Sequence, residues 1–241
     1  MTWLDRPLAS LDLETTGVNP EMDRIVSAAV VKYDGGRAAR AQTWLADPGI
    51  PISPGASAVH GFTTEYVRAE GRPAAAVVGE IIAALVAAVE AGWPVVVMNA
   101  PFDLTMLERE AARYGLVSLF SQVSPLVLDP RILDKQVDRY RKGRRRLEDL
   151  CRTYGVVLDG AHDARADAVA ACEVTVAIAR AYPWLAEIPL RSLHAQQVRW
   201  AETQQTNLRE HFAVTSGKEN RVVTVRTDWP LTPLTRSGWD L

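Results

Sequence analysis

The sequence predicts an α/β fold, in which a mixed five-stranded β-sheet is flanked by helices and followed by a C-terminal helical extension. Three runs rich in apolar and β-branched residues lie within residues 8–46 and are joined by short links, which favours an antiparallel meander. Two further apolar runs, at residues 95–98 and 126–128, alternate with helical patterns. This alternation is typical of strands that helices cover on both faces.

The composition is that of a protein with a sizeable core and little net charge. The 241 residues are 48% hydrophobic, which suffices for one domain with an appendage. A formal net charge of −2 excludes a generally basic protein that coats nucleic acid, although it is compatible with a local basic patch. Cys151 and Cys172 lie far apart in the sequence, so neither a zinc site nor a disulfide framework is indicated.

No targeting or membrane-spanning pattern is visible in the sequence. The N-terminal residues show no signal-peptide pattern. The longest apolar run, residues 77–91, is interrupted by Glu80 and Glu90 and is too short to span a bilayer. We therefore expect a cytoplasmic protein without a membrane partner.

The first half of the chain is expected to form the meander and one long helix. A turn at residues 34–36 separates the second strand from the third, and a loop rich in proline and glycine follows at residues 47–55. The alanine-rich residues 73–91 carry an apolar stripe with helical spacing, and Gly92 follows directly, as is common just past a helix end. The strands are expected at residues 8–13, 24–32 and 41–46.

The second half alternates strands with helices. The strand at residues 95–98 runs into a helix that ends near Tyr114, and the strand at residues 126–128 ends at Asp129. Arginine or lysine then occupies six positions between residues 139 and 146. This basic segment is either a solvated surface run or a strip that holds a nucleic-acid backbone. Two further helices are expected, at residues 147–154 and 163–182.

Two acids stand at the end of the first strand. Asp12 and Glu14 project from the same face, because side chains alternate along a strand. Neighbouring carboxylates at the end of a buried strand are costly unless a cation lies between them, and hard oxygen ligands suit Mg²⁺ or Mn²⁺. Taken alone, the pair is equally compatible with a strand end that starts a turn, with Gly17 in the left-handed conformation.

Three later residues extend this pattern. Asp103 stands at a helix start, where an aspartate also commonly caps the helix. His162 and Asp167 are five positions apart, about 140° of helical rotation, so two helical residues at this spacing would not face one ligand. The arrangement makes sense if Asp163 caps the helix and His162 precedes it. A histidine that titrates near neutrality suits proton abstraction from water, whereas an exposed loop histidine beside a solvated aspartate is the ordinary alternative.

Together these residues resemble the motifs of the DEDDh-type 3′→5′ exonucleases, the DnaQ-like family that includes the proofreading epsilon subunits of bacterial DNA polymerase III. The resemblance covers residues 7–182 and rests on three main motifs, at residues 11–17, 99–103 and 162–168. The segment His60-Gly61-Phe62-Thr63 and the stretch at residues 143–155 are also similar to the family. Phe62 is a departure, since the family more often has a branched aliphatic residue there.

The resemblance implies a ribonuclease H-like fold, an exonuclease domain over residues 1–185, and hydrolysis of terminal phosphodiester bonds with two divalent ions, Mg²⁺ or Mn²⁺. It also implies that His162 acts as general base on the attacking water. The expected metal ligands are Asp12, Glu14, Asp103 and Asp167. The expected substrate-binding residues are Thr15 and Thr16 through main-chain groups near them, His60, Phe62, Asn99 and Phe102. For Phe102, a place in the core is an equal alternative.

The substrate expected from this resemblance is single-stranded or 3′-ended nucleic acid, with DNA favoured. RNA trimming or degradation of oligoribonucleotides is the alternative with the same chemistry, because discrimination depends on contacts near the 2′ position. A catalytically silent nucleic-acid-binding module is a third alternative. The complete set of acids with its histidine argues against it.

Residues 186–241 lie beyond these motifs and are expected to form a C-terminal helix with a short strand and a tail. Large and apolar residues recur at three- and four-residue steps from Leu190 to Phe212, which predicts a helix with a narrow seam. This helix either packs on the exonuclease domain or pairs with a partner, such as a DNA polymerase subunit or a second copy of the chain.

Three smaller features complete the extension. Residues 205–212 faintly resemble a sliding-clamp-binding peptide, but such peptides are normally extended, so the helix is preferred. A short strand is expected at residues 222–225. Trp229, Pro230 and Trp239 suggest an aromatic tail docked onto the body of the protein.

Overall fold

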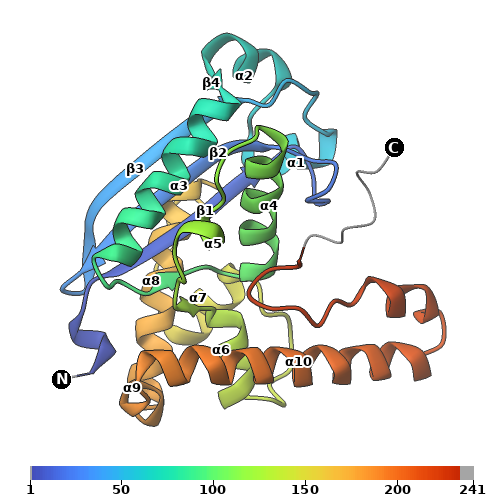
Figure 1. The fold of residues 1–241 in the computed structure, drawn as a ribbon. Helices are drawn as coiled ribbons and strands as arrows, with labels where there is room; N and C mark the ends of the chain where they lie inside the picture. The colour runs from blue at the N-terminus through green and yellow to red at the C-terminus, as the bar shows by residue number, and fades with distance from the viewer. Residues whose placement is uncertain (1, 234–241) are drawn as a thin grey trace.

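The computed structural model describes residues 2–233, and its strands form one mixed six-stranded sheet in the order β4-β3-β2-β1-β5-β6 (Figure 1). Neighbours among the first three strands are antiparallel. Beyond β1 the sheet continues with β5, which is parallel to β1, and β6, which is parallel to β5. The strands are β1 (Leu8–Thr15), β2 (Ile25–Asp34), β3 (Arg37–Asp47), β4 (Arg72–Pro73), β5 (Val95–Val96) and β6 (Val127–Leu128).

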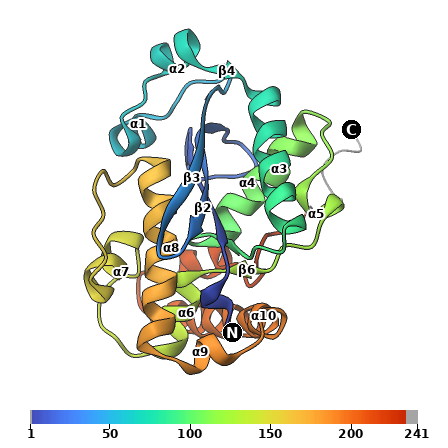
Figure 2. The same cartoon turned by 90° about the vertical axis from the view of Figure 1, so that its left-hand side faces the viewer.

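Helices cover both faces of this sheet. Figure 2 shows α8 on one side of the strands and α3 with α4 on the other. The α-helices are α1 (Pro54–His60), α2 (Thr64–Glu70), α3 (Ala74–Glu90), α4 (Ala100–Arg113), α5 (Leu119–Gln122), α6 (Pro130–Val137), α7 (Leu147–Tyr154), α8 (Ala164–Ala181), α9 (Trp184–Glu187) and α10 (Leu190–Val214). Two short 3₁₀ helices, η1 (Trp3–Asp5) and η2 (Glu219–Thr224), lie near the ends of the described chain.

The α/β class and the mixed sheet are confirmed, and the sixth strand is the difference from the expected five. β4 has two residues, which pair in parallel with Ala46 and Asp47 of β3. Arg72 and Pro73 form no apolar run, so no pattern marks them as a strand. The pairing arises from tertiary structure, because the chain leaving α2 lies beside the end of β3.

β1, β2 and β3 are longer than the apolar patterns predict, whereas β5 and β6 have two residues each and are shorter than the strands expected at residues 95–98 and 126–128. β1 continues to Thr15, so Glu14 belongs to the strand rather than to a turn after it. β3 begins at Arg37 instead of residue 41. The apolar pattern does not reveal this earlier start, because the first half of the strand is exposed. α7 has the bounds that the sequence predicts.

Alternation along β1 separates the core from the acidic residues. Leu11 and Leu13 are buried in a cluster with side chains of α3 and α4. Asp12 and Glu14 therefore point to the opposite face, which α8 covers. Asp167 lies in the first turn of α8 and so reaches the same side of the sheet.

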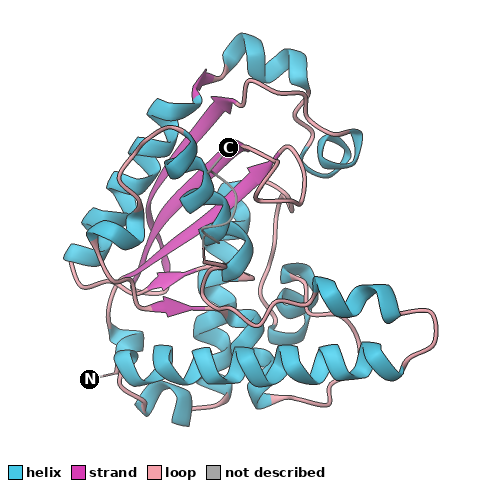
Figure 3. Cartoon of the chain, turned by 45° about the vertical axis from the view of Figure 1, so that its right-hand side comes forward, coloured by secondary structure: helices cyan, strands magenta, loops and turns pink. Residues whose placement is uncertain are grey.

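The C-terminal helix α10 lies below the strands in Figure 3 and packs on the body of the protein. Gln197 is fully buried, and its Oε1 atom accepts from the Asp129 amide over 2.8 Å, while its Nε2 atom donates to the Val127 carbonyl over 3.0 Å. His194 accepts from the Val127 amide over 3.0 Å. Side chains of α10 thus take the place of a neighbouring strand at the outer edge of β6, where unpaired groups would otherwise be costly.

The remaining expectations for the extension have mixed outcomes. Residues 205–212 are helical within α10, as preferred. The strand expected at residues 222–225 is wrong, because that stretch lies mostly in η2, and none of the strands in residues 2–233 pairs with it. Trp229 is buried in the core cluster, while Trp239 lies outside the described residues. Within residues 2–233, no helix has the length and apolar character needed to cross a membrane.

Candidate active site

The end of β1 carries the first two acids. Glu14 is buried and Asp12 is half-buried. The main-chain amide of Leu13 donates to the Oδ1 atom of Asp103 over 3.1 Å, which ties the first turn of α4 to the middle of this acidic pair. Asp103 therefore does not cap α4: its carboxylate serves β1, and the cap position belongs to Asn99.

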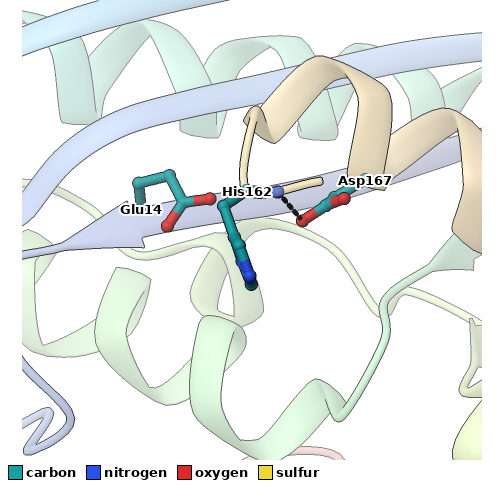
Figure 4. Close-up of side chains that lie close together, drawn as sticks. All are labelled: Glu14, His162 and Asp167. Carbon is teal, nitrogen blue, oxygen red and sulfur yellow. Dashed lines mark hydrogen bonds between the residues drawn. The ribbon is translucent and has the colours of Figure 1, made fainter. Parts of the chain in front are cut away.

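Glu14 also lies close to two residues that enter from α8. One potential metal-ligand atom from each of three side chains lies within 4.8 Å of the other two. The three residues are Glu14, His162 and Asp167. In Figure 4, His162 stands between the two carboxylates. Asp163 caps α8 by accepting from the Ala166 amide over 2.9 Å, and His162 precedes the helix with a left-handed φ of 68°. This local arrangement is the one that the sequence predicts.

The carboxylates raise one another's pKa values. Burial, followed by the charges of Asp167 and Asp163, raises the pKa of Glu14 to about 8. Burial raises the pKa of Asp12 well above its ordinary value, and the charges of Asp103, Asp167 and Glu14 add to the shift. Burial likewise raises the pKa of Asp103, although the bond from Leu13 opposes the shift. Without a cation between them, these acids therefore keep protons to higher pH than isolated carboxyl groups do.

A divalent cation fits this donor set. The Oδ1 atom of Asp167 is buried without a hydrogen-bond partner, whereas its Oδ2 atom accepts from the His162 amide over 3.2 Å. A buried carboxylate oxygen without a partner is expensive unless a metal or a water satisfies it. Clustered carboxylate oxygens are the ligands that Mg²⁺ and Mn²⁺ prefer.

His60 borders the same site. Its Nδ1 atom accepts from the Phe62 amide over 3.1 Å, so its Nε2 atom carries the proton and donates to the Thr15 carbonyl over 3.2 Å. Burial, together with the charge of His162, lowers the pKa of His60. The rings of His60 and Phe62 are 5.4 Å apart, and that of Tyr66 stacks on Phe62 at 6.0 Å, so a row of three rings starts at the end of β1.

The groups near Thr15 and Thr16 have partners within the protein. The Thr16 amide donates to the Arg24 carbonyl over 2.9 Å, and the Thr15 hydroxyl donates to the Gly17 carbonyl over 2.6 Å. Gly17 is not in the left-handed conformation. A Cβ atom there would meet the Asp23 carboxylate at 2.5 Å, so a larger residue would displace a side chain that accepts from the Thr16 hydroxyl and the Asn19 amide. The substrate-binding role of Thr15 and Thr16 stays a prediction.

Asn99 and Phe102 are also engaged internally. Asn99 adopts a left-handed conformation with φ of 60°, and its side-chain oxygen accepts from Arg131. Phe102 is half-buried and packs against the main core cluster, which agrees with its core alternative. Their contacts with a nucleotide stay predictions, and for Asn99 such a contact has to compete with Arg131.

Comparison with known proteins decides the family. Residues 10–175, more than half of the chain, match the family described as Exonuclease, RNase_T. The chain belongs to the exonuclease family. A DNA polymerase III subunit epsilon-like protein of Rhodobacter capsulatus is 33% identical over 167 residues, which are 67% of this chain and 22% of that protein. The chain thus spans less than a quarter of the length of this relative.

Solved structures of exonuclease I share the fold of this exonuclease-family chain. One has a TM-score of 0.61 at 22% identity, over 74% of this chain and 43% of the other. Exonuclease I of E. coli in complex with a dT13 oligonucleotide has a TM-score of 0.60 at 22% identity, with the same coverage of 74% and 43%. At this identity the similarity establishes the fold. The DnaQ-like family predicted from the sequence is confirmed.

Two carboxylates near this exonuclease-family site were not predicted as site residues from the sequence. Asp129 is buried and accepts from the amides of Asn99, Ala100 and Arg131, so it caps α6 and fixes the start of α4. An aspartate before a proline at a helix start is a signal for such a cap. Glu148 of α7 lies 3.4 Å from the Nε2 atom of His162. No sequence pattern indicates this contact, because tertiary packing brings α7 beside α8.

The basic segment at residues 139–146 divides into two groups. Arg141 and Arg145 both bind the buried carboxylate of Asp134, at 2.7 and 2.6 Å, and the Tyr154 hydroxyl donates to the same residue over 2.9 Å. These two arginines therefore hold α6 against the loop that follows it. Arg139 is exposed and lies over the ring of Tyr140 at 5.6 Å.

Proposed function

We propose that this exonuclease-family chain is a metal-dependent 3′→5′ exonuclease that removes terminal nucleotides from DNA. The observation that carries the proposal is the carboxylate cluster at the end of β1. The charged groups that shift the pKa of Asp12 are all carboxylates, and the Oδ1 atom of Asp167 is buried without a hydrogen-bond partner. Such a cluster is unfavourable as a purely structural feature and favourable as a cage for cations.

Each acid has a role in this proposal. Asp12, Glu14, Asp103 and Asp167 would hold two divalent ions, Mg²⁺ or Mn²⁺. When bound, such ions neutralise charge on the phosphate and on the leaving oxygen and lower the pKa of the attacking water. Leu13 fixes Asp103 through its amide, and the His162 amide fixes Asp167, so the main chain sets both carboxylates before substrate arrives.

His162 is proposed as the general base. It stands before α8 with its side chain about half exposed, so its imidazole reaches both the acidic cluster and solvent. Glu148, 3.4 Å from its Nε2 atom, orients the ring and stabilises the imidazolium that forms when a proton leaves the water. We assign Glu148 as a positioning residue.

The terminal nucleotide is proposed to meet the row of rings that begins at His60. His60 is held in one tautomer by Phe62 and Thr15, and it is neutral at physiological pH because burial lowers its pKa. Phe62 and Tyr66 continue the row, and Tyr66 is 48% exposed. Every nucleobase offers a face to such rings, which explains how a site of this kind tolerates all sequences.

DNA is proposed as the substrate on the strength of the relatives. The Rhodobacter capsulatus relative is described as epsilon-like, and the E. coli exonuclease I structure contains a dT13 oligonucleotide. The alternative is RNA, with the same residues and the same chemistry.

A polymerase subunit or a second copy, bound through α10, is the partner suggested by the sequence. In the structure, Leu193, Gln197 and Ala201 of α10 are buried against the chain itself. We therefore propose that α10 serves mainly to complete the domain.

The test is hydrolysis of 3′-labelled single-stranded DNA, mismatched duplex and RNA in the presence of Mg²⁺, Mn²⁺ or EDTA, beside an Asp12→Ala control. We expect metal-dependent release of nucleotides from DNA and none from the variant. Preference for RNA would favour the alternative substrate. The absence of metal-dependent release from every substrate would overturn the proposal.

A further inference from the structure

A groove of about 430 Å³ lies between α6 and α10, outside the acidic site. Cationic side chains of Arg131, Lys135, Arg139 and Arg145 line it, together with Tyr140 and Leu208. Among the described residues that line the groove, none is acidic. In a chain with a formal net charge of −2, this is a local concentration of positive charge.

The charge of the groove is only partly cancelled from below, because the buried carboxylate of Asp134 binds Arg145. Asp134 is buried and is shared by Arg141, Arg145 and the Tyr154 hydroxyl. Burial lowers the pKa of Lys135, and the neighbouring charges of Arg145, Arg139 and Arg141 lower it further against the opposing effect of Asp134. The groove therefore gains free energy from an anion that neutralises this repulsion.

One end of the groove adjoins the start of α4, which also carries Asp103. Arg131 donates to the side chain of Asn99, which stands just after β5 and four residues before Asp103. A smaller cavity beside Asn99 shares Arg131, Ile132 and Gln205 with the groove. Asn99 and Arg131 therefore lie between the groove and Asp103, and Asp129 and Asp228 also line the smaller cavity beside them.

The remaining side chains suit a polynucleotide. Tyr140 is 86% exposed, and the guanidinium of Arg139 lies over its ring at 5.6 Å. An exposed ring next to cations is the combination that holds bases and phosphates of single strands together. Amide side chains of Gln136 and Asn207 also line the groove and offer hydrogen bonds to base edges.

We propose that the groove between α6 and α10 binds the single-stranded stretch of the substrate that precedes its 3′-terminal nucleotides. This inference rests on the proposed nuclease function and adds a second contact region to it. Arg139 and Lys135 hold phosphates, and Tyr140 stacks on a base. An acidic peptide is the other anionic chain with the required charge, but it would gain little from the exposed ring and has no reason to adjoin the acidic site.

The test is the dependence of binding and hydrolysis on substrate length. Oligothymidylates of about 4 to 16 nucleotides cover the range over which such grooves act. For the unaltered chain, we expect kcat/KM and affinity to rise with length. For the double variant Arg139→Ala/Tyr140→Ala, we expect about tenfold weaker binding of the longest oligonucleotide and unchanged hydrolysis of the shortest. When the logarithm of the binding constant is plotted against the logarithm of the salt concentration, the slope for the double variant should be smaller by about 0.7, because one phosphate contact is lost.

Arg37→Ala is the matched control, since Arg37 is an exposed cation on the β2–β3 hairpin. It should leave the length dependence intact. Both altered residues of the double variant are exposed, and an unchanged Tm verifies that the variant folds. Length dependence that is the same in the double variant and the unaltered chain would overturn the inference, as would tighter binding of a labelled oligoglutamate peptide than of oligothymidylate. Loss of hydrolysis at every length in the unaltered chain would instead overturn the nuclease function.

Discussion

The main-chain amide of His162 donates to the Oδ2 atom of Asp167 over 3.2 Å, so the loop before α8 is tied to the first turn of that helix. Five positions along a continuous helix would turn the two residues away from each other. The left-handed conformation of His162 reverses the chain instead, and Asp163 caps the helix between them. One short turn thereby delivers a fixed carboxylate and a more exposed imidazole to the same site.

Replacement of His162 tests the role of that imidazole. His162→Ala should lower kcat by about 10²- to 10⁴-fold, the usual contribution of a positioned general base. Its Tm should change little, because the His162 side chain is 45% exposed. The measurement is single-turnover hydrolysis at saturating metal, with Tm as the control for folding.

Glu148→Gln separates positioning from catalysis. Loss of the carboxylate 3.4 Å from the Nε2 atom should lower kcat by less than loss of the imidazole itself and leave KM unchanged, because the ring is no longer oriented but is still present. An unchanged kcat, or a fall equal to that of His162→Ala, would contradict the positioning role.

The crowded carboxylates link metal binding to stability. Mg²⁺ or Mn²⁺ at about one hundred times its dissociation constant should raise the free energy of unfolding by about 2.7 kcal/mol. Asp12→Asn removes one of the mutually repelling acids, so it should stabilise the metal-free chain by about 1–2 kcal/mol and weaken the response to metal. Thermal melts with EDTA and with each ion measure both effects. A Tm that ignores metal in the unaltered chain would count against the cage.

The metal-free chain should lose stability as the pH rises above neutrality. Glu14 has its pKa raised from 4.5 to about 8, chiefly by burial. Between these values the folded chain keeps a proton that the unfolded chain has released, so the free energy of unfolding decreases with rising pH. His60 has the opposite effect only below its ordinary pKa of 6.5, because burial lowers its pKa in the folded state.

Melts in EDTA between about pH 7 and pH 8 isolate the contribution of the acids. We expect the Tm of the unaltered chain to fall across this interval and that of Glu14→Gln to fall less. Saturating Mg²⁺ should flatten the dependence, because the ion replaces the proton. A Tm that rises with pH in EDTA would show that Glu14 is ionised throughout.

The local parts of the fold and of the site are the parts that the sequence predicts. The bounds of α7 follow from its helical pattern, and the cap of α8 follows from the spacing of His162, Asp163 and Asp167. In each case the interactions that decide the structure lie within a few residues of one another. The placement of Asp12 and Glu14 on one face of β1 is also predicted, because it depends only on the alternation of side chains along a strand.

The parts that the sequence does not predict depend on distant contacts. β4 exists only because the chain passes beside β3. Residues 222–225 have an apolar pattern but form no strand, because none of the described strands pairs with them. Asp129 has a local signal for its cap of α6 but not for its bond with Asn99, 30 residues away, and Glu148 meets His162 only because α7 packs beside α8. Arg141 and Arg145, which lie in the basic segment, instead satisfy the buried Asp134.

Gln197 offers a test of whether α10 completes the domain. Its side chain is fully buried and pairs with the Asp129 amide and the Val127 carbonyl. Gln197→Leu leaves both main-chain groups of the β6 region without partners, at about 1–3 kcal/mol each. We therefore expect a decrease of about 2–6 kcal/mol in the free energy of unfolding by urea.

Gln196→Leu is the control, because it makes the same change one position earlier, where the side chain is only half-buried. It should alter the free energy of unfolding by about 0.5 kcal/mol or less. If α10 were a separate unit, Gln197→Leu would leave the main unfolding transition in place and affect only a minor one. A single transition that shifts as a whole means that residues beyond the family motifs stabilise the edge of the sheet beside the active site.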